Sequence, residues 1–292
     1  MVNTKVSIGM PVYNSEKWVA ATIESLLSQT YENTEIVISD NCSTDSSGSI
    51  ISDYARMDKR IKYHRNDRNI GVNGNYNLVF QKSTGTYFKW ASSNDLCHPQ
   101  YIEKCVDILD SNADVVLCYP KTFLLFENDS LEEYEDNLNL TEECACMRLR
   151  HVLNKVGLNN AMNGLIRRDA LAQTRLHLPY LGSDLNLLVE LALLGKLFEL
   201  PDRMFFRRMD GESATKYMSR DQQEAYFFPE KTRKPTFQFW RQTIGYFSSV
   251  MRNKMPADQK LCAISYLMKF SFWNKARLIN DLPIFARFVR KG

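Results

Sequence analysis

The chain has no apolar run that approaches the roughly 20 residues that a helix needs to span a bilayer. It also lacks a signal pattern, because residues 1–4 are too short and too polar for one before a strand pattern begins. Its net charge is only +3, which provides no general attraction to nucleic acid. With 292 residues, 44% of them hydrophobic, the chain can bury a sizeable core. We therefore expect a cytoplasmic globular protein whose partners do not include nucleic acid.

Two common nucleotide-binding motifs are missing as well. No G-x-G-x-x-G follows the first strand pattern and no G-x-x-x-x-G-K-[ST] occurs, so the usual dinucleotide and triphosphate cradles are excluded. The seven cysteines show no zinc-site spacing, and Cys144 and Cys146 make only a lone C-x-C. We expect reduced thiols, which are usual in a cytosolic protein.

Short apolar runs do alternate with helical patterns over the first part of the chain. The runs that predict strands are 6–13, 35–39, 61–64, 87–91 and 115–119. Helical apolar patterns separate them, and Ser15 is the predicted cap of the first helix. The alternation predicts an α/β fold in which helices cover both faces of a largely parallel sheet.

The rest of the chain is less regular. We expect an exposed loop at 127–143, where the chain is acidic, and an apolar helix at 184–194 that ends at Gly195. The apolar residues at 204–206 indicate strand material. After about Pro235 the pattern is helical and rich in aromatic and basic residues, which predicts a C-terminal helical extension.

Polar segments stand at the ends of three predicted strands, at 11–14, 39–45 and 92–95. The carboxyl ends of parallel strands meet at one edge of a sheet, and ligands bind there. The three segments are therefore predicted to line one pocket.

In this order the segments resemble the family 2 glycosyltransferases, which have the GT-A fold. The opening P-x-Y/F-N motif reads Pro11-Val12-Tyr13-Asn14. The blocks that follow are S-x-x-x-Q-T at 25–30, D-N-x-S-x-D at 40–45, N-x-G at 69–71 and S-x-G-x-Y at 83–87. The resemblance covers about residues 5–210. It implies a GT-A catalytic domain over 1–215 with a mixed, mainly parallel sheet, and a helical region over 216–292.

The resemblance also implies residues that bind a nucleotide-sugar donor. They are Pro11, Tyr13 and Asn14 around the base and ribose, Asp40 on the base, and Asn69 and Gly71 beside the diphosphate. A carboxylate such as Asp40 suits a uracil, because the imide edge of that base offers an N–H. By their residue types alone, Asp40, Asn69 and Gly71 are also compatible with ordinary turns.

The acidic metal motif of the family, D-x-D-D, is reduced here to Ser92-Ser93-Asn94-Asp95. Asp95 matches the metal-binding aspartate, and Asn94 a neighbour that contacts ribose or metal. Mn²⁺ or Mg²⁺ is the implied cofactor, since both prefer oxygen ligands and bridge to diphosphate oxygens. Asp210 matches a late histidine of the family and is a second implied metal ligand. Arg207 and Arg208 precede it and would neutralise the diphosphate. Alternatively, they belong to a surface turn.

Asp184 matches the position of the catalytic base, which takes a proton from the acceptor hydroxyl. As a residue alone, Asp184 could equally favour the start of the helix that follows it. The resemblance implies an inverting, metal-dependent glycosyltransferase with a UDP-linked donor and a glycan, lipid-linked or protein acceptor. One alternative is a non-catalytic nucleotide-sugar-binding protein with a degenerate metal site. A second is a nucleotidyltransferase, but residues 10–14 lack the Gly-rich loop with Lys or Arg that is usual in that class.

The end of the chain is basic, with nine Lys and Arg against two Asp and Glu from Arg252 to Gly292. Aromatic residues lie among these charges, such as Phe272 and Trp273. The pattern is typical of a helix on an anionic membrane, here the inner face of the cell membrane. Packing against a second subunit or against the catalytic domain would explain it equally.

Overall fold

The computed structural model describes residues 4–209 and 237–282. Within them nine strands form one sheet in the order β3-β2-β1-β4-β8-β6-β9-β5, and β7 pairs with β6. The strands are β1 Val6–Val12, β2 Thr34–Asp40, β3 Ile61–Arg65, β4 Tyr87–Trp90, β5 Leu96–Cys97, β6 Val115–Leu125, β7 Leu131–Tyr134, β8 Leu165–Arg167 and β9 Lys196–Arg208. Strands β3, β2, β1 and β4 are parallel, as are β6 and β9, whereas β8, β5 and β7 pair antiparallel. The predicted mixed, mainly parallel sheet is confirmed.

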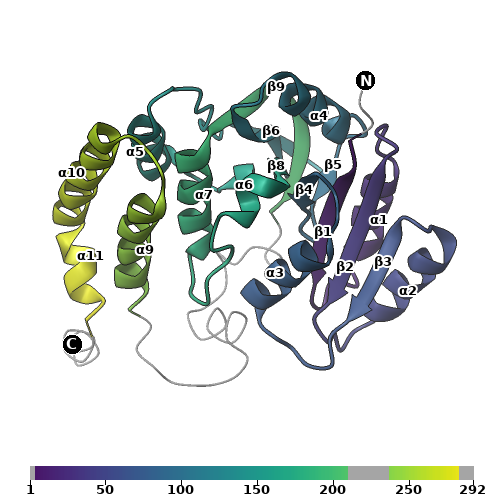
Figure 1. The fold of residues 1–292 in the computed structure, drawn as a ribbon. Helices are drawn as coiled ribbons and strands as arrows, with labels where there is room; N and C mark the ends of the chain where they lie inside the picture. Colours follow the sequence, from purple (N-terminus) through teal and green to yellow (C-terminus); the bar gives the residue numbers. More distant parts are fainter. Residues whose placement is uncertain (1–3, 210–236, 283–292) are drawn as a thin grey trace.

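Helices cover both faces of this sheet (Figure 1). The helices before the C-terminal region are α1 Val19–Leu27, α2 Ser47–Met57, α3 Val72–Lys82, α4 Tyr101–Ser111, α5 Ala145–Lys155, η1 Asn160–Asn163, α6 Arg168–Ala172 and α7 Ser183–Leu194. One core cluster lies beneath α1, α2 and α4, and a second lies beneath α3, α5 and α7. Every residue of β1 and β2 is buried, which explains why these strands are continuous apolar runs in the sequence.

The C-terminal helices are α9 Gln238–Arg252, α10 Ala257–Trp273 and α11 Lys275–Asn280. They stack beside α5 and α7, at the end of the molecule away from α1 and α2 (Figure 1). Tyr246, Val250 and Leu267 belong to the same buried cluster as Leu188 of α7. The predicted helical extension is confirmed, and it shares its core with the sheet domain.

Two local predictions were wrong. Residues 127–143 are not simply a loop, because they contain β7, and Leu138 and Leu140 are fully buried. The acidic side chains of β7 hid this strand, since they face outward, where Glu133 pairs with Arg203. Ser15 does not cap α1, which begins at Val19; its hydroxyl donates instead to the carbonyl of Ser93, at 3.1 Å.

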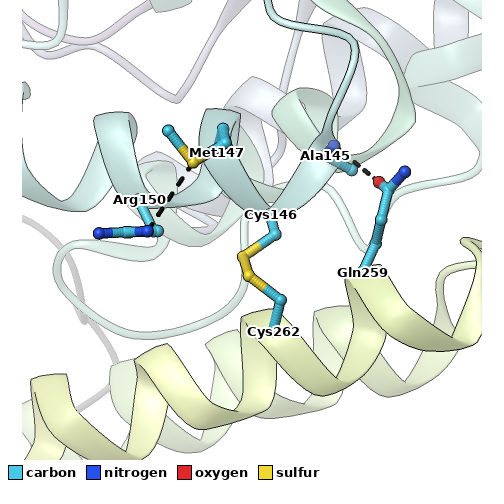
Figure 2. The surroundings of a disulfide bond; sticks show 6 residues. All are labelled: Ala145, Cys146, Met147, Arg150, Gln259 and Cys262. Atoms are coloured by element: carbon cyan, nitrogen blue, oxygen red, sulfur yellow. Dashed lines mark hydrogen bonds between the residues drawn. A yellow bond between two sulfur atoms is a disulfide. The ribbon is translucent and has the colours of Figure 1, made fainter.

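The expectation of reduced thiols is wrong for one pair of cysteines. Cys146 of α5 and Cys262 of α10 form a disulfide, with their Cα atoms 6.1 Å apart (Figure 2). The other five cysteines are free. The pair is separated by 116 residues, so nothing in the local spacing indicated it. The bond joins the C-terminal helices covalently to the sheet domain.

Among the helices of the two described ranges, none combines the length and apolar character that crossing a membrane requires.

Candidate functional site

A cavity of about 410 Å³ opens at the carboxyl ends of β1 and β4, between α3, the start of α7 and the end of β9. Eight of the predicted site residues line it, namely Pro11, Tyr13, Asn69, Asn94, Asp95, Asp184, Arg207 and Arg208. Asn14, Asp40 and Gly71 are not part of its wall. Asp210 lies outside the described residues. The three polar strand ends therefore do meet at one pocket, as predicted from the parallel sheet.

Asp40, at the end of β2, is fully buried behind the cavity. Its carboxylate accepts hydrogen bonds from the Ser43 backbone at 2.8 Å, from the Tyr63 hydroxyl at 3.2 Å and from Arg65 at 2.7 Å. The carboxylate thus fixes the loop after β2, and this loop presents the next residue, Asn41, to the cavity.

Asn41 was not among the predicted residues. Its amide nitrogen donates to Asn69 Oδ1 at 2.7 Å, and its Oδ1 accepts from the Ile70 backbone at 2.9 Å. Asn69 Oδ1 also accepts from the Gly71 backbone at 2.9 Å. Gly71 has φ 78°, a conformation that glycine adopts without strain. Asn69 and Gly71 therefore make the turn that starts α3 as well as one side of the cavity.

Asn14 stabilises the loop after β2 from the other side. Its backbone N–H donates to Ser43 Oγ at 3.0 Å, and its Oδ1 accepts from the Thr44 backbone at 2.8 Å. Asn14 itself has φ 48°, which asparagine tolerates better than most residues. Its contacts hold the wall in place behind Tyr13.

Asp95 lies on the cavity wall and is only 8% exposed. Burial raises the pKa of its carboxyl, against the opposing effects of the Arg207 charge and the Arg208 backbone N–H. That N–H donates to Asp95 Oδ1 at 2.9 Å. The Asp95 carboxylate is an oxygen ligand of the kind that Mn²⁺ and Mg²⁺ prefer. Among the residues described, no three His, Cys, Asp or Glu side chains gather into a metal cluster.

Arg207 and Arg208 bring positive charge to the same end of the cavity. Arg207 donates to the Leu158 carbonyl and to Asn160 Oδ1, both at 2.6 Å. The Arg208 guanidinium lies 3.7 Å from the centre of the Trp18 ring and donates to the Asn94 carbonyl at 3.1 Å. Both cations are thus held in fixed positions where an anionic group can meet them.

Asp184 lies in the first turn of α7 and also lines the cavity. Its Oδ2 accepts a hydrogen bond from Asn159 Nδ2 at 2.7 Å. Gly182, before the helix, has φ 81°, and a Cβ there would lie 3.1 Å from the Gln242 amide nitrogen. The glycine therefore allows the tight turn that places Asp184 at the cavity wall.

His177 also lines the cavity and was missed by the sequence analysis. It is 8% exposed, and the Tyr76 and Trp90 rings meet it edge-on at centroid distances of 5.1 and 5.0 Å. Burial lowers its pKa to about 4, although the nearby Asp184 charge acts in the opposite direction. The histidine lies in an irregular segment outside the family motifs, so neither periodicity nor resemblance pointed to it.

The segment 177–182 is held from two sides. On one side, α3 supplies Asn77, which exchanges two hydrogen bonds with the His177 backbone, at 3.0 and 2.8 Å. On the other side, Gln242 of α9 donates to the Gly182 carbonyl at 3.2 Å and accepts at its own carbonyl from Asn186 at 3.0 Å. The C-terminal helices therefore help to fix the position of Asp184.

Comparison with known proteins gives consistent matches. The model of the family described as glycosyl transferase family 2 matches residues 7–170. An uncharacterized glycosyltransferase of Haemophilus influenzae is 24% identical over 253 residues, 82% of this chain and 75% of that protein. The putative glycosyltransferase EpsH of Bacillus subtilis is 30% identical over 142 residues, 47% of this chain and 41% of that protein. The chain thus spans less than half the length of EpsH.

Solved structures in complex with nucleotide sugars have a similar fold. S. aureus TarS 1–349 in complex with UDP-GlcNAc matches with a TM-score of 0.66 and 16% identity, over 96% of this chain and 80% of that one. The mannosyltransferase PcManGT from Pyrobaculum calidifontis, in complex with GDP-Man and Mn²⁺, has a TM-score of 0.55 and 11% identity, over 98% and 83%. At this low sequence identity the comparison shows similarity of the fold alone, and it confirms the predicted GT-A fold.

Proposed function

This chain belongs to glycosyl transferase family 2 and is a glycosyltransferase, and on that premise we propose an inverting, metal-dependent transfer of sugar from a nucleotide-linked donor to an acceptor hydroxyl. The observation that carries the proposal is one cavity whose wall contains Asp95, Arg207 and Arg208 together with Asp184. The two cations suit a diphosphate, and the Asp184 carboxylate suits an acceptor hydroxyl.

The donor is a nucleotide sugar, and UDP is the proposed nucleotide. TarS carries UDP-GlcNAc and PcManGT carries GDP-Man in related folds, which supports this class of donor without deciding the base. Pro11 and Tyr13 would pack on the base and ribose. Asp40 would reach an imide N–H only after Tyr63 or Arg65 moved, so its first effect is to hold the loop that carries Asn41.

Mn²⁺ or Mg²⁺ would be held by Asp95, with diphosphate oxygens and water as further ligands. Asn94, the preceding residue, and Asp210, which lies outside the described residues, are the other groups proposed to assist it. The ion would supply positive charge to the leaving diphosphate. The two arginines act on the same charge, since Arg207 and Arg208 are already fixed in the cavity wall. Asp95 is the one carboxylate among the described residues that is proposed to hold the ion. We therefore expect the metal to bind together with the nucleotide rather than before it.

In the reaction, Asp184 takes the proton of the acceptor hydroxyl as its oxygen attacks the anomeric carbon. The bond between that carbon and the diphosphate oxygen breaks, and its electron pair leaves with the nucleoside diphosphate. Attack from the face opposite the diphosphate inverts the anomeric configuration. Asn159 keeps the Asp184 carboxylate oriented through its hydrogen bond.

The test is calorimetric binding of UDP, GDP, UDP-GlcNAc, UDP-glucose and GDP-mannose with and without Mn²⁺. We expect tight binding of one nucleotide series only with Mn²⁺, and a loss of that dependence in Asp95→Asn. Equal binding with and without the metal would contradict the metal role. Tight binding with no turnover by any acceptor would favour the alternative, a non-catalytic nucleotide-sugar-binding protein.

We also propose that the acceptor is a growing glycan or lipid-linked sugar at the inner face of the cell membrane, in polysaccharide biosynthesis. The support comes from α10, where several large apolar side chains are more than 60% exposed, namely Leu261, Met268, Phe272 and Trp273. The first three recur at helical spacing on one face. Basic residues accompany them, and no acidic residue occurs between Asp258 and Asp281. An anionic bilayer matches both features.

Sedimentation with vesicles tests the membrane proposal. We expect the protein to bind vesicles that contain phosphatidylglycerol but not pure phosphatidylcholine, and to dissociate at high salt. The double variant Phe272→Ser, Trp273→Ser should lose binding and keep its melting temperature, because both side chains are exposed. Unchanged binding by this variant, or a dimer that it dissociates, would contradict the proposal. We therefore propose that residues 1–215 catalyse the transfer and that residues 216–292 contact the membrane or the acceptor.

A further inference from the structure

Two buried polar atoms in the cavity wall have no hydrogen-bond partner. Within the described residues, five buried side-chain nitrogen or oxygen atoms lack a partner, and two of these belong to residues that line the cavity, His177 Nε2 and Asn159 Oδ1. Buried polar atoms in folded proteins are nearly always paired, and an exception calls for a ligand or water. Both residues are 8% exposed, so bulk solvent does not satisfy them.

These atoms cannot relax easily toward other partners. The His177 backbone is fixed by Asn77, and its ring is confined by Tyr76 and Trp90. The Asn159 amide is oriented because its nitrogen donates to Asp184. The two unpaired atoms are therefore preorganised, which reduces the entropy lost when a ligand binds.

Both residues with unpaired atoms lie close to Asp184. Both residues are coupled to Asp184, Asn159 through the hydrogen bond and His177 through the electrostatic effect of that charge. Arg207 holds the same segment, since it donates to the Leu158 carbonyl and to Asn160 Oδ1 on either side of Asn159, whereas Arg208 donates to the Asn94 carbonyl. In the proposed reaction the transferred sugar lies between the diphosphate and Asp184, and both unpaired atoms belong to residues that line the same cavity and interact with Asp184.

We propose that His177 Nε2 and Asn159 Oδ1 form a subsite for hydroxyl groups of the transferred sugar. A hydroxyl both donates and accepts, so it can satisfy an amide oxygen, which only accepts, and an imidazole nitrogen of either tautomer. A diphosphate ester has no proton to give to Asn159 Oδ1, and His177, which is neutral near pH 7, adds no positive charge to hold one. The inference rests on the proposed function and names His177 and Asn159 as residues that select the donor sugar.

The experiment compares each nucleotide sugar with its own nucleoside diphosphate, in the full-length protein with Mn²⁺. UDP, UDP-glucose, UDP-galactose, UDP-GlcNAc, GDP and GDP-mannose are titrated by calorimetry into the wild type, His177→Ala and Asn159→Ala. For the preferred sugar we expect each variant to lose about tenfold in affinity, the scale of one hydrogen bond with a buried partner. Binding of the matching diphosphate alone should change less than about twofold, because it does not reach the subsite.

Two further measurements keep the result specific. His98→Ala is the matched control, because His98 follows the Asp95 loop but does not line the cavity, and it should bind every ligand as the wild type does. Donor analogues that lack one sugar hydroxyl should bind the wild type about tenfold more weakly than the intact donor does. His177→Ala should bind one of these analogues and the intact donor with equal affinity.

Equal losses for diphosphate and nucleotide sugar would overturn the subsite, because they would indicate a general distortion of the cavity. Unchanged affinity for the sugar in both variants would overturn it too. Failure of the wild type to bind any nucleotide would instead refute the proposed function, and the inference with it. The three results are distinguishable in a single series of titrations.

Discussion

His177 shows at the residue scale how burial changes the acid sensitivity of this fold. Its folded-state pKa is about 4, below the ordinary value of 6.5, because the buried ring resists protonation. The unfolded chain therefore binds a proton first as the pH falls. The part of the unfolding free energy that depends on this group is intact above about pH 6.5 and is lost progressively down to about pH 4.

We predict that His177→Gln removes this part of the pH dependence. The wild type should lose about 3 kcal/mol more than the variant between pH 7 and pH 4, since 2.5 pKa units correspond to that amount. Urea unfolding of both proteins across this range measures the difference. Parallel curves for the two proteins would mean that His177 titrates normally in the folded state.

The residues that the sequence predicted well are those at strand ends. Asp95, Tyr13 and Asn94 follow buried apolar strands. The parallel sheet therefore brings them to one edge, whatever structure the other segments adopt. Asn159 and His177 belong to irregular segments, and only long-range packing places them. Local patterns carry no signal for such residues.

At the scale of elements, α9 supports the turn that carries Asp184. Its Gly245 lies so close to α7 that a Cβ would come within 2.3 Å of the Asn186 amide nitrogen. We predict that Gly245→Ala lowers stability by roughly 1–3 kcal/mol, the usual result of overpacking, although alanine favours helices. The same shift should displace Asn186 and lower the turnover number.

Gly74→Ala is the matched control, because this helical glycine in α3 has room for a Cβ, its nearest neighbour being an Ile70 side-chain atom at 3.4 Å. It should raise stability by about 0.5–1 kcal/mol. Thermal unfolding of the two variants measures both effects. Stabilisation by both substitutions would show that α9 does not press against α7.

The periodicity of the sequence was sufficient for the long buried elements and insufficient for several others, among them β5, β7 and α5. The buried runs β1 and β2 and the apolar α7 were predicted close to their observed bounds. Strand β7 was missed, because an edge strand with outward acidic side chains resembles a loop in the sequence. The pairing of its main chain with β6 is a long-range contact that composition does not reveal.

For the molecule as a whole, the Cys146–Cys262 bond joins the two regions that the sequence separates (Figure 2). We predict that Cys262→Ser lowers stability by on the order of 2–4 kcal/mol, since the bond closes a long loop in the unfolded chain. Dithiothreitol should lower the melting temperature of the wild type and leave this variant unchanged. Cys144→Ser, beside the bonded cysteine, is the control that should respond to the reductant as the wild type does. A wild type indifferent to dithiothreitol would show that the bond adds no stability.

The C-terminal helices cannot be removed as a separate unit. Truncation before α9 would remove Tyr246 and Val250 from the buried cluster and expose the faces of α5 and α7 on which α9 and α10 pack. It would also remove the Gln242 contact with Gly182. Membrane binding is therefore better tested by exposed substitutions on α10 than by truncation.

An inverting transfer by this protein depends most on Asp184 as the base. The most direct measurement is release of nucleoside diphosphate from the preferred donor, with the product's anomeric configuration read by NMR, for the wild type and Asp184→Asn. We predict an inverted product and a turnover number lower by about 10²–10⁴-fold in the variant, with donor affinity preserved. Ser183→Ala, its neighbour in α7, should remain active. A retained configuration, or an Asp184→Asn variant as fast as the wild type, would contradict the account.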